Sequence, residues 1–286
     1  MRTSDYLLIT VMALSFSSAS VLVLLSRAPG PVAATWRLVF SSAILMAFSA
    51  ATGRLRELSA LRKRDLALLL LSGVFLAAHF DLWMTSLYFI SVAVSVTLVD
   101  SYPAVLVVVG RLLFKESYSA RELLGSLVAM AGVAMLSLLD PSARFLYGVI
   151  LSIGGMISMV AYLSLGKAMR RMISTTSYTL VVYSSAAAVS GLVSLVGGFN
   201  MVRYGPASWA YLLALAVIPM MGGHTVMNYL IGRRNLIAST IAMMAEPVGS
   251  AALAYVIFGQ VIRPEEAAFM AVTLLGIGVA TTPRRP

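Results

Sequence analysis

The sequence contains no cysteine and few charged residues. The absence of cysteine excludes disulfide bonds and thiolate metal sites. The only two histidines do not have the i, i+4 spacing of a helical metal site, so we expect no metal and no cofactor. Charged residues occupy 11% of the 286 positions, whereas a soluble domain has about 25%. This deficit argues against a soluble globular protein.

Apolar residues take the place of the missing charge. They make up 60% of the chain, compared with about 45–50% in soluble domains. A single globule cannot bury so much apolar surface, which predicts an all-α integral membrane protein. The net charge of +10 does not indicate a nucleic-acid partner, because the basic residues lie between apolar runs rather than along one face.

Ten apolar runs fill nearly the whole chain, and each is close to the length of about 20 residues that crosses a bilayer. The first run resembles a secretory signal peptide, but it is longer than a typical apolar core of such a peptide, so we interpret it as a spanning helix. The connections are too short for a soluble domain. The ten predicted spans are 6–25, 31–52, 66–87, 91–113, 120–139, 145–165, 177–198, 208–230, 236–258 and 264–282.

The basic residues predict the orientation of these spans. If the N-terminus is cytoplasmic, 16 of the 21 Lys and Arg residues fall in inner segments and four in outer segments, with Arg37 inside a span. Cytoplasmic loops carry an excess of Lys and Arg. We therefore predict that both termini face the cytoplasm and that the protein lies in the cell (cytoplasmic) membrane.

A weak internal repeat divides the chain into two halves. Residues 103–135 align with 247–279, so that Pro103 matches Pro247, and one upstream insertion brings His79 opposite His224. Five spans in each half is an odd number, so the second half must be inverted in the membrane. We predict one five-helix repeat over 1–143 and an inverted one over 144–286. Inverted repeats are typical of secondary transporters, whose substrate site lies near mid-membrane between the repeats.

Several segments resemble a known family. The stretches "MAEPVGSAALAYVIFGQVIRPEEAAFMAVTLLGIGVA" and "DSYPAVLVVVGRLLFKESYSARELLGSLVAMAGVAML" resemble the closing signatures of the two halves of EamA-type proteins in the drug/metabolite transporter (DMT) superfamily. "ATWRLVFSSAIL" resembles the second span. Phe16 replaces a frequent Trp and Gln260 a frequent Glu, while His79 and Asp81 are not part of the general pattern. The resemblance implies ten helices, alternating access, and substrates such as amino acids, other metabolites, drugs or nucleotide sugars.

Two acids in the predicted spans are the leading candidates for substrate recognition or proton coupling. An ionised side chain at the bilayer centre costs at least about 2.5–3.5 kcal/mol on insertion scales. Glu246 precedes Pro247, which frees a backbone carbonyl one turn earlier and predicts a local helix break. Glu246 is either a cavity acid or a structural anchor for that break. Asp100 lies near the symmetric position, three residues before Pro103, and is either a cavity acid or a neutral hydrogen-bonding group.

Arg37, Asp81 and His79 are the other ionisable candidates. Arg37 either snorkels to the outer surface, neutralises Asp81 or Asp100, or binds a substrate carboxylate through its two-pronged guanidinium. His79 and Asp81 are two residues apart and point about 200° from each other on a helix, so they form no dyad. We expect one of them to face the cavity and the other a neighbouring helix. The alternative is that both form interhelical hydrogen bonds.

Softer candidates complete the predicted site. Hydroxyl and aromatic side chains line a cavity in one interpretation, and serve as helix packing or interface belts in the other. They are His224, Ser17, Ser18, Trp36, Trp83, Tyr102, Tyr162 and Tyr183, and the predicted gating or helix-break positions are Pro103, Pro219, Gly222, Gly223 and Pro247.

The sequence thus predicts a transporter rather than an enzyme. It would export amino acids or related small metabolites by alternating access, with the bilayer as its environment and protons as a candidate coupling ion. One alternative is a lipid flippase or scramblase on the same fold. The other is an intramembrane lipid-modifying enzyme, for which we find neither an Asp-rich cluster nor a Ser–His–acid pattern.

Overall fold

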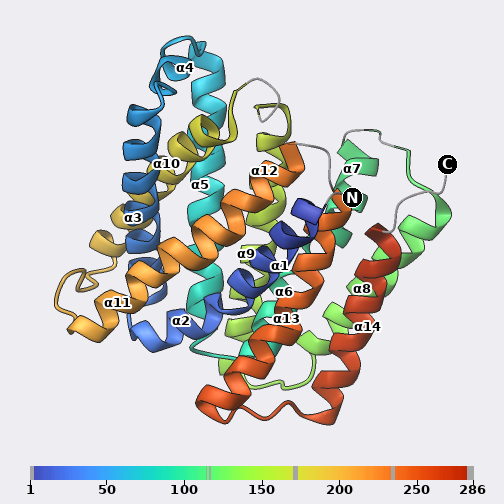
Figure 1. Ribbon diagram of the computed structural model, residues 1–286. Coiled ribbons are helices and arrows are strands. Elements are labelled where there is room, and N and C mark those ends of the chain that lie inside the picture. Colours follow the sequence, from blue (N-terminus) through green and yellow to red (C-terminus); the bar gives the residue numbers. More distant parts are fainter. Residues whose placement is uncertain (1–2, 114, 116, 170–172, 233–235, 282–286) are drawn as a thin grey trace.

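The computed structural model describes residues 3–113, 115, 117–169, 173–232 and 236–281. Every regular element in these ranges is a helix, and Figure 1 shows their arrangement. The elements are α1 (Thr3–Ser17), α2 (Ala19–Ser26), α3 (Gly30–Ala51), α4 (Leu55–Ser59), α5 (Lys63–Ser86), α6 (Val92–Val99), α7 (Tyr102–Leu113), α8 (Ala120–Ser137), α9 (Ala143–Met169), α10 (Thr175–Val196), α11 (Pro206–Leu215), η1 (Ala216–Thr225), α12 (Val226–Gly232), α13 (Leu236–Phe258) and α14 (Pro264–Thr281).

The described helices confirm the predicted all-α membrane class. Nine segments are long and apolar enough to cross a bilayer, and Met244–Phe258 of α13 forms a shorter apolar helix in the region of the remaining predicted span. The nine are Leu7–Ser26, Gly30–Ala51, Lys63–Ser86, Val92–Leu112, Ala120–Ser137, Ala143–Gly166, Thr175–Val196, Pro206–Leu230 and Pro264–Thr281.

Local sequence signals set several helix starts. The Ser91 hydroxyl accepts the backbone N–H of Val94 at the start of α6. Ser119 and Glu122 form a reciprocal capping box at the start of α8. Pro206 occupies the first turn of α11, where its missing N–H has no intrahelical acceptor to lose.

Three spans are irregular at membrane depth. The first is divided at Ser18 between α1 and α2, and the fourth is divided at residues 100–101, between α6 and α7. The eighth contains the π-helix η1, which includes Pro219, and such segments are frequent at functional sites.

The expected break at Pro247 was wrong, because α13 continues through this residue. Neighbouring helices can support a proline inside a membrane helix.

The main helix contacts join the two halves of the sequence. Helix α8 packs along α14, α3 along α10, α5 along α9 and α1 along α13. Figure 1 shows α8 and α14 side by side at the right of the molecule. The third span, α5, contacts the first span of the second half, α9. The symmetric contact joins the third span of the second half, α11 and η1, to the first span of the chain, α1 and α2. The interface between the halves therefore forms most of the core.

Glycine sets the close approach of α8 and α14. A Cβ atom on Gly276 would collide with the backbone nitrogen of Ala129, whereas one on Gly278 would lie 3.1 Å from the flexible end of Met244. We therefore expect Gly276→Ala to cost about 1–3 kcal/mol through overpacking and to lower the melting temperature, measured by thermal unfolding in detergent. Gly278→Ala is the matched control and should stay near wild type. Equal melting temperatures for both variants would contradict the claim that the missing Cβ of Gly276 allows α8 and α14 to pack closely.

The absence of cysteine allows a direct test of the predicted orientation. Ala60, after α4, and Ala143, the first residue of α9, are exposed positions that should lie on opposite sides of the membrane. In intact cells, a membrane-impermeant maleimide should label Ala143→Cys and leave Ala60→Cys unlabelled until the cells are opened. The reverse pattern would show that the termini face the outside and that the predicted orientation is wrong.

Candidate functional site: a polar cavity between the two halves

A small cavity lies where the two halves meet. Its volume is about 20 Å³, enough for about one water molecule. Phe16, Ala19, Val99 and Met159 provide apolar parts of the wall. The structure also brings seven of the predicted site residues together around it: Arg37, His79, Trp83, Asp100, Tyr102, His224 and Glu246.

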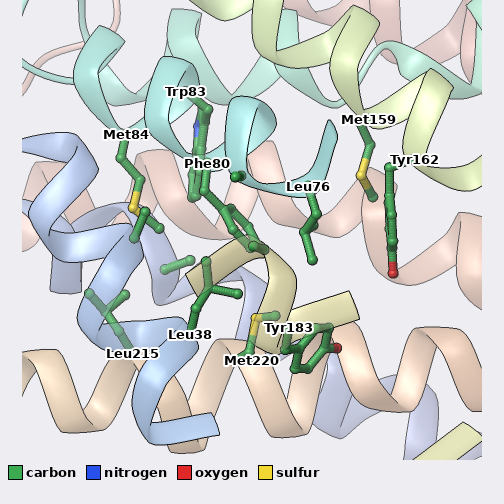
Figure 2. Packing of buried hydrophobic residues seen from close by; sticks show 14 of the residues in the cluster. Leu38, Leu76, Phe80, Trp83, Met84, Met159, Tyr162, Tyr183, Leu215 and Met220 are labelled. Carbon is green, nitrogen blue, oxygen red and sulfur yellow. The ribbon is translucent and has the colours of Figure 1, made fainter. Parts of the chain in front are cut away.

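Among the described residues, Arg37 is the only basic group on the cavity wall apart from the two histidines, and it is fully buried. Its Nε donates a hydrogen bond to the sulfur of Met220 at 3.2 Å, and its guanidinium carbon lies 4.3 Å from the centre of the Phe80 ring. Figure 2 shows Phe80 and Met220 in the surrounding core. Arg37 forms no ion pair with a carboxylate of the described chain, and Nη1 and Nη2 have no partner there. The side chain therefore does not snorkel to the surface, and its charge is directed at the cavity.

The two histidines meet at this cavity from equivalent positions of the repeat. Their ring centres are 6.2 Å apart. His79 Nδ1 lies 3.0 Å from the carbonyl oxygen of Gly155, and because a carbonyl only accepts, the proton of this bond belongs to Nδ1. The His79 ring stacks on Trp83 at 6.1 Å. The His224 ring is held edge-on by the rings of Phe16 and Phe80, at 5.0 and 5.1 Å.

Asp100 and Glu246 supply the acidic part of the wall. Asp100 ends α6 at the interruption of the fourth span, and Glu246 lies within α13. Both side chains are buried and interact electrostatically with each other, while Glu246 also attracts Arg37. The cavity therefore has one cationic side chain and two carboxyl groups within a small volume.

Four predicted site residues lie beside this cavity rather than on its wall. Asp81 is not part of its wall and lies near Ser190 of α10. Ser17 packs against Gly249 of α13, and the Ser18 hydroxyl donates to the carbonyl of Ser15 at the break of the first span. Trp36 donates from Nε1 to the carbonyl of Met201 at 2.7 Å, within an aromatic cluster near the expected outer surface. The contacts of Ser17 and Ser18 are those of residues in helix packing rather than on the cavity wall.

The tyrosines Tyr162 and Tyr183 belong to a buried polar network next to His224. Asn228 Nδ2 donates to the Tyr162 hydroxyl at 2.9 Å and to the carbonyl of His224 at 2.9 Å. Tyr183 and Thr225 share a hydrogen bond of 3.2 Å. The sequence analysis missed Asn228, whose signal was a lone amide in an apolar run, four residues after His224. This network fixes the end of η1 that carries His224.

Hydrogen bonds hold the two halves together at the end of the bundle that we expect to be outside. The side-chain oxygen of Gln260 accepts the backbone N–H of Val92 at 3.0 Å. Arg144 of the second half donates to the carbonyl of Tyr88 at 2.9 Å. Within the first half, the Tyr88 hydroxyl donates to the carbonyl of Ala28 at 2.7 Å. The bonds of Gln260 and Arg144 therefore join the connections of one half to those of the other at this end.

One contact also joins the halves at the opposite end. The carboxylate of Glu57 in α4 accepts the backbone N–H of Ser174 at 3.0 Å, at the start of α10. Partial burial acts to raise the pKa of Glu57, but hydrogen bonds from Ser174 and Ser177 outweigh it and hold the pKa below its usual value. Both ends of the interface are therefore held by contacts between the halves.

A helical membrane protein with a polar cavity between two similar halves belongs, by its architecture, to the class of membrane transporters. The comparison with family models agrees with this class. The model described as the EamA-like transporter family matches residues 4–138 and again 146–282. The chain is a member of the EamA-like transporter family, and the two matched ranges lie on either side of the predicted boundary at residue 143.

Solved structures support the same fold. A crystal structure titled only "Crystal structure of protein" superposes with a TM-score of 0.70, covers 98% of each chain and has 18% sequence identity. At this identity the likeness concerns the fold alone. The search of curated proteins found no match.

The Gln260 contact gives a testable prediction about the outer closure. Gln260→Ala removes the acceptor for the Val92 N–H, a bond worth about 1 kcal/mol, so the population of opened molecules should rise about fivefold. The measurement is the rate at which an impermeant thiol reagent modifies Ala19→Cys, a cavity position, from outside. Gln260→Glu keeps an acceptor oxygen and is the control. Identical rates in all three backgrounds would contradict a closing role for Gln260.

Proposed function

We propose that this protein is a secondary transporter of the cell membrane that exports amino acids or related small metabolites by alternating access. The observation that carries the proposal is the cavity between the halves, whose buried wall holds both Arg37 and the Asp100–Glu246 pair. Family membership supports transport in general. The wall chemistry supports a substrate that carries both signs of charge.

An amino acid matches the charges on the wall. A guanidinium binds a carboxylate through two parallel hydrogen bonds, and the terminal nitrogens of Arg37 are unused by the described chain. An ammonium group is attracted by carboxylates, here Asp100 and Glu246. Phe16, Val99 and Met159 offer apolar surface for a side chain.

Proton coupling follows from the same pair of acids. Two neighbouring carboxyl groups in the membrane are costly when both are ionised. A proton shared by Asp100 and Glu246 would therefore stabilise the site before substrate binds. A substrate ammonium next to the pair replaces the charge of that proton. Binding of the amino group and release of a proton are then linked, so proton entry down its gradient would drive export of the substrate.

Alternating access accounts for the small volume of the cavity. A pocket for a small molecule usually measures about 300–1,000 Å³, far more than the space between the halves here. Substrate entry therefore requires the halves to separate at one end. The break at Ser18 and the irregular helix η1, with Pro219, Gly222 and Gly223, are suitable places for bending.

A lipid flippase or scramblase is a weaker second candidate. A groove between α13 and α14 is lined by apolar residues such as Val248, Tyr255 and Leu274, with Gln260 near one end. Such a groove suits acyl chains, but the described residues of its wall include no charged group that would conduct a lipid head group. The polar groups described above lie instead at the cavity between the halves.

The central test is counterflow uptake into proteoliposomes loaded with pooled amino acids. We expect Glu246→Gln to slow uptake by at least tenfold, because hydrogen bonds to charged groups contribute about 1.5–3 kcal/mol. An imposed pH gradient should drive uptake in the wild type and should have no effect on the residual uptake of the variant.

The matched control is Glu265→Gln, which removes an exposed acid at the start of α14. It should transport like the wild type. Full activity of a folded Glu246→Gln protein would refute the role of Glu246. Absence of exchange for every water-soluble pool, with movement of labelled lipid, would favour the second candidate.

A further inference from the structure

Four buried side-chain nitrogens at the cavity have no hydrogen-bond partner in the described chain. They are Nη1 and Nη2 of Arg37, Nε1 of Trp83 and Nδ1 of His224. All three residues line the cavity. An unpaired buried polar group costs about 1–3 kcal/mol, and more when it is charged. Most buried polar groups in proteins are paired, so three neighbouring residues with unpaired nitrogens need an explanation.

The contacts between rings place these nitrogens around one space. Phe80 connects Arg37 and His224, because the guanidinium lies over its ring and His224 meets it edge-on. Trp83 lies one turn after Phe80 on α5 and stacks on His79, whose ring faces His224. Figure 2 shows Phe80 and Trp83 extending from α5 into this region.

The chemistry of the three groups selects one kind of ligand. Guanidinium and indole N–H groups only donate, and an imidazole donates from Nδ1 when its proton is there. These nitrogens together form a set of donors that fits an oxyanion. The unpaired Oδ2 of Asp100 on the same wall is an acceptor and suits the ammonium group of the substrate instead. His79 is not part of the set, because its Nδ1 is engaged by the carbonyl of Gly155, and it acts instead as a support for the Trp83 ring.

We propose that Arg37, Trp83 and His224 form an oxyanion-binding cluster that holds the carboxylate of the transported substrate. The inference rests on the proposed transport function and extends it. It assigns hydrogen-bonding roles to Trp83 and His224, and it makes a carboxylate a requirement for binding. The carboxyl groups of Asp100 and Glu246 on the same cavity disfavour a second negative charge, so the preferred ligand is a monocarboxylate with an amino group.

Competition in the counterflow assay tests the requirement for a carboxylate. Uptake of a labelled amino-acid mixture is challenged with pooled amino acids or with the same pool as α-amides. In the wild type the acids should compete and the amides should be at least tenfold weaker, because the amides lack the charged acceptor. Equally strong competition by the amides would overturn the cluster while leaving transport intact.

Trp83→Phe removes one donor and keeps an aromatic ring. It should weaken competition by the acids roughly tenfold and leave competition by the amides unchanged. Trp209→Phe is the control, because Trp209 belongs to the aromatic cluster with Trp36 and does not line the cavity. His224→Phe provides a second, independent donor deletion, and both variants are first checked for folding by thermal unfolding.

A binding assay separates failure of the cluster from failure of the transport proposal. In detergent, pooled monocarboxylates and inorganic phosphate are tested for thermal stabilisation of the wild type, Trp83→Phe and His224→Phe. Stabilisation by carboxylates that both variants lose supports the cluster, even if no amino acid is exchanged in liposomes. Stabilisation by phosphate alone would overturn the carboxylate assignment, and stabilisation by neither anion would overturn the cluster itself.

Discussion

The burial of one positive charge organises the centre of this protein. Arg37 lies inside a membrane span, fully buried and without an ion-pair partner in the described chain. A charge in this position is expensive, and proteins retain one where it faces a partner or a cavity. The sulfur of Met220 and the face of Phe80 offset part of the cost, and Glu246 contributes attraction at longer range. The remaining donors are aimed at the space where the halves meet.

The construction from two halves explains why the charge can be placed there. Most of the helix contacts join the halves, and the close approach of α8 and α14 depends on glycines with no room for a Cβ atom. Around the cavity the helices are less regular, with breaks at Ser18 and at residues 100–101 and a π-helix before Val226. In the proposed transport cycle, the close-packed α8–α14 contact would stay fixed and the irregular segments at the centre would bend.

Much of this architecture could be predicted from the sequence. Apolar length and composition were enough to place the spans, because a bilayer sets the length of each helix. The repeat aligned His79 with His224, but it did not predict that the two rings meet at the cavity, which is a tertiary contact. Pro103 and Pro247 were both predicted helix-break positions. The fourth span is interrupted at residues 100–101, just before Pro103, whereas α13 continues through Pro247.

Side-chain direction was harder to predict. Trp36 and Arg37 are neighbours in sequence, yet one lies in the cluster near the expected outer surface and the other reaches the cavity. Tyr102 and Tyr162 looked alike in the sequence, but only Tyr102 is on the cavity wall. Asn228 was missed because its importance comes from the Tyr162 hydroxyl, which the fold brings to it, in addition to the local carbonyl of His224 four residues earlier. Such tertiary contacts leave no periodic signal in the sequence.

The most direct measurement of the central claim is photo-crosslinking of the reconstituted protein with diazirine-bearing amino acids, followed by mapping of the adducts by mass spectrometry. If the cavity between the halves is the transport site, adducts should form on wall residues such as Phe16, Trp83 and Met159, and excess unlabelled amino acid should suppress them. Adducts confined to the groove between α13 and α14, or unaffected by competitor, would contradict the account.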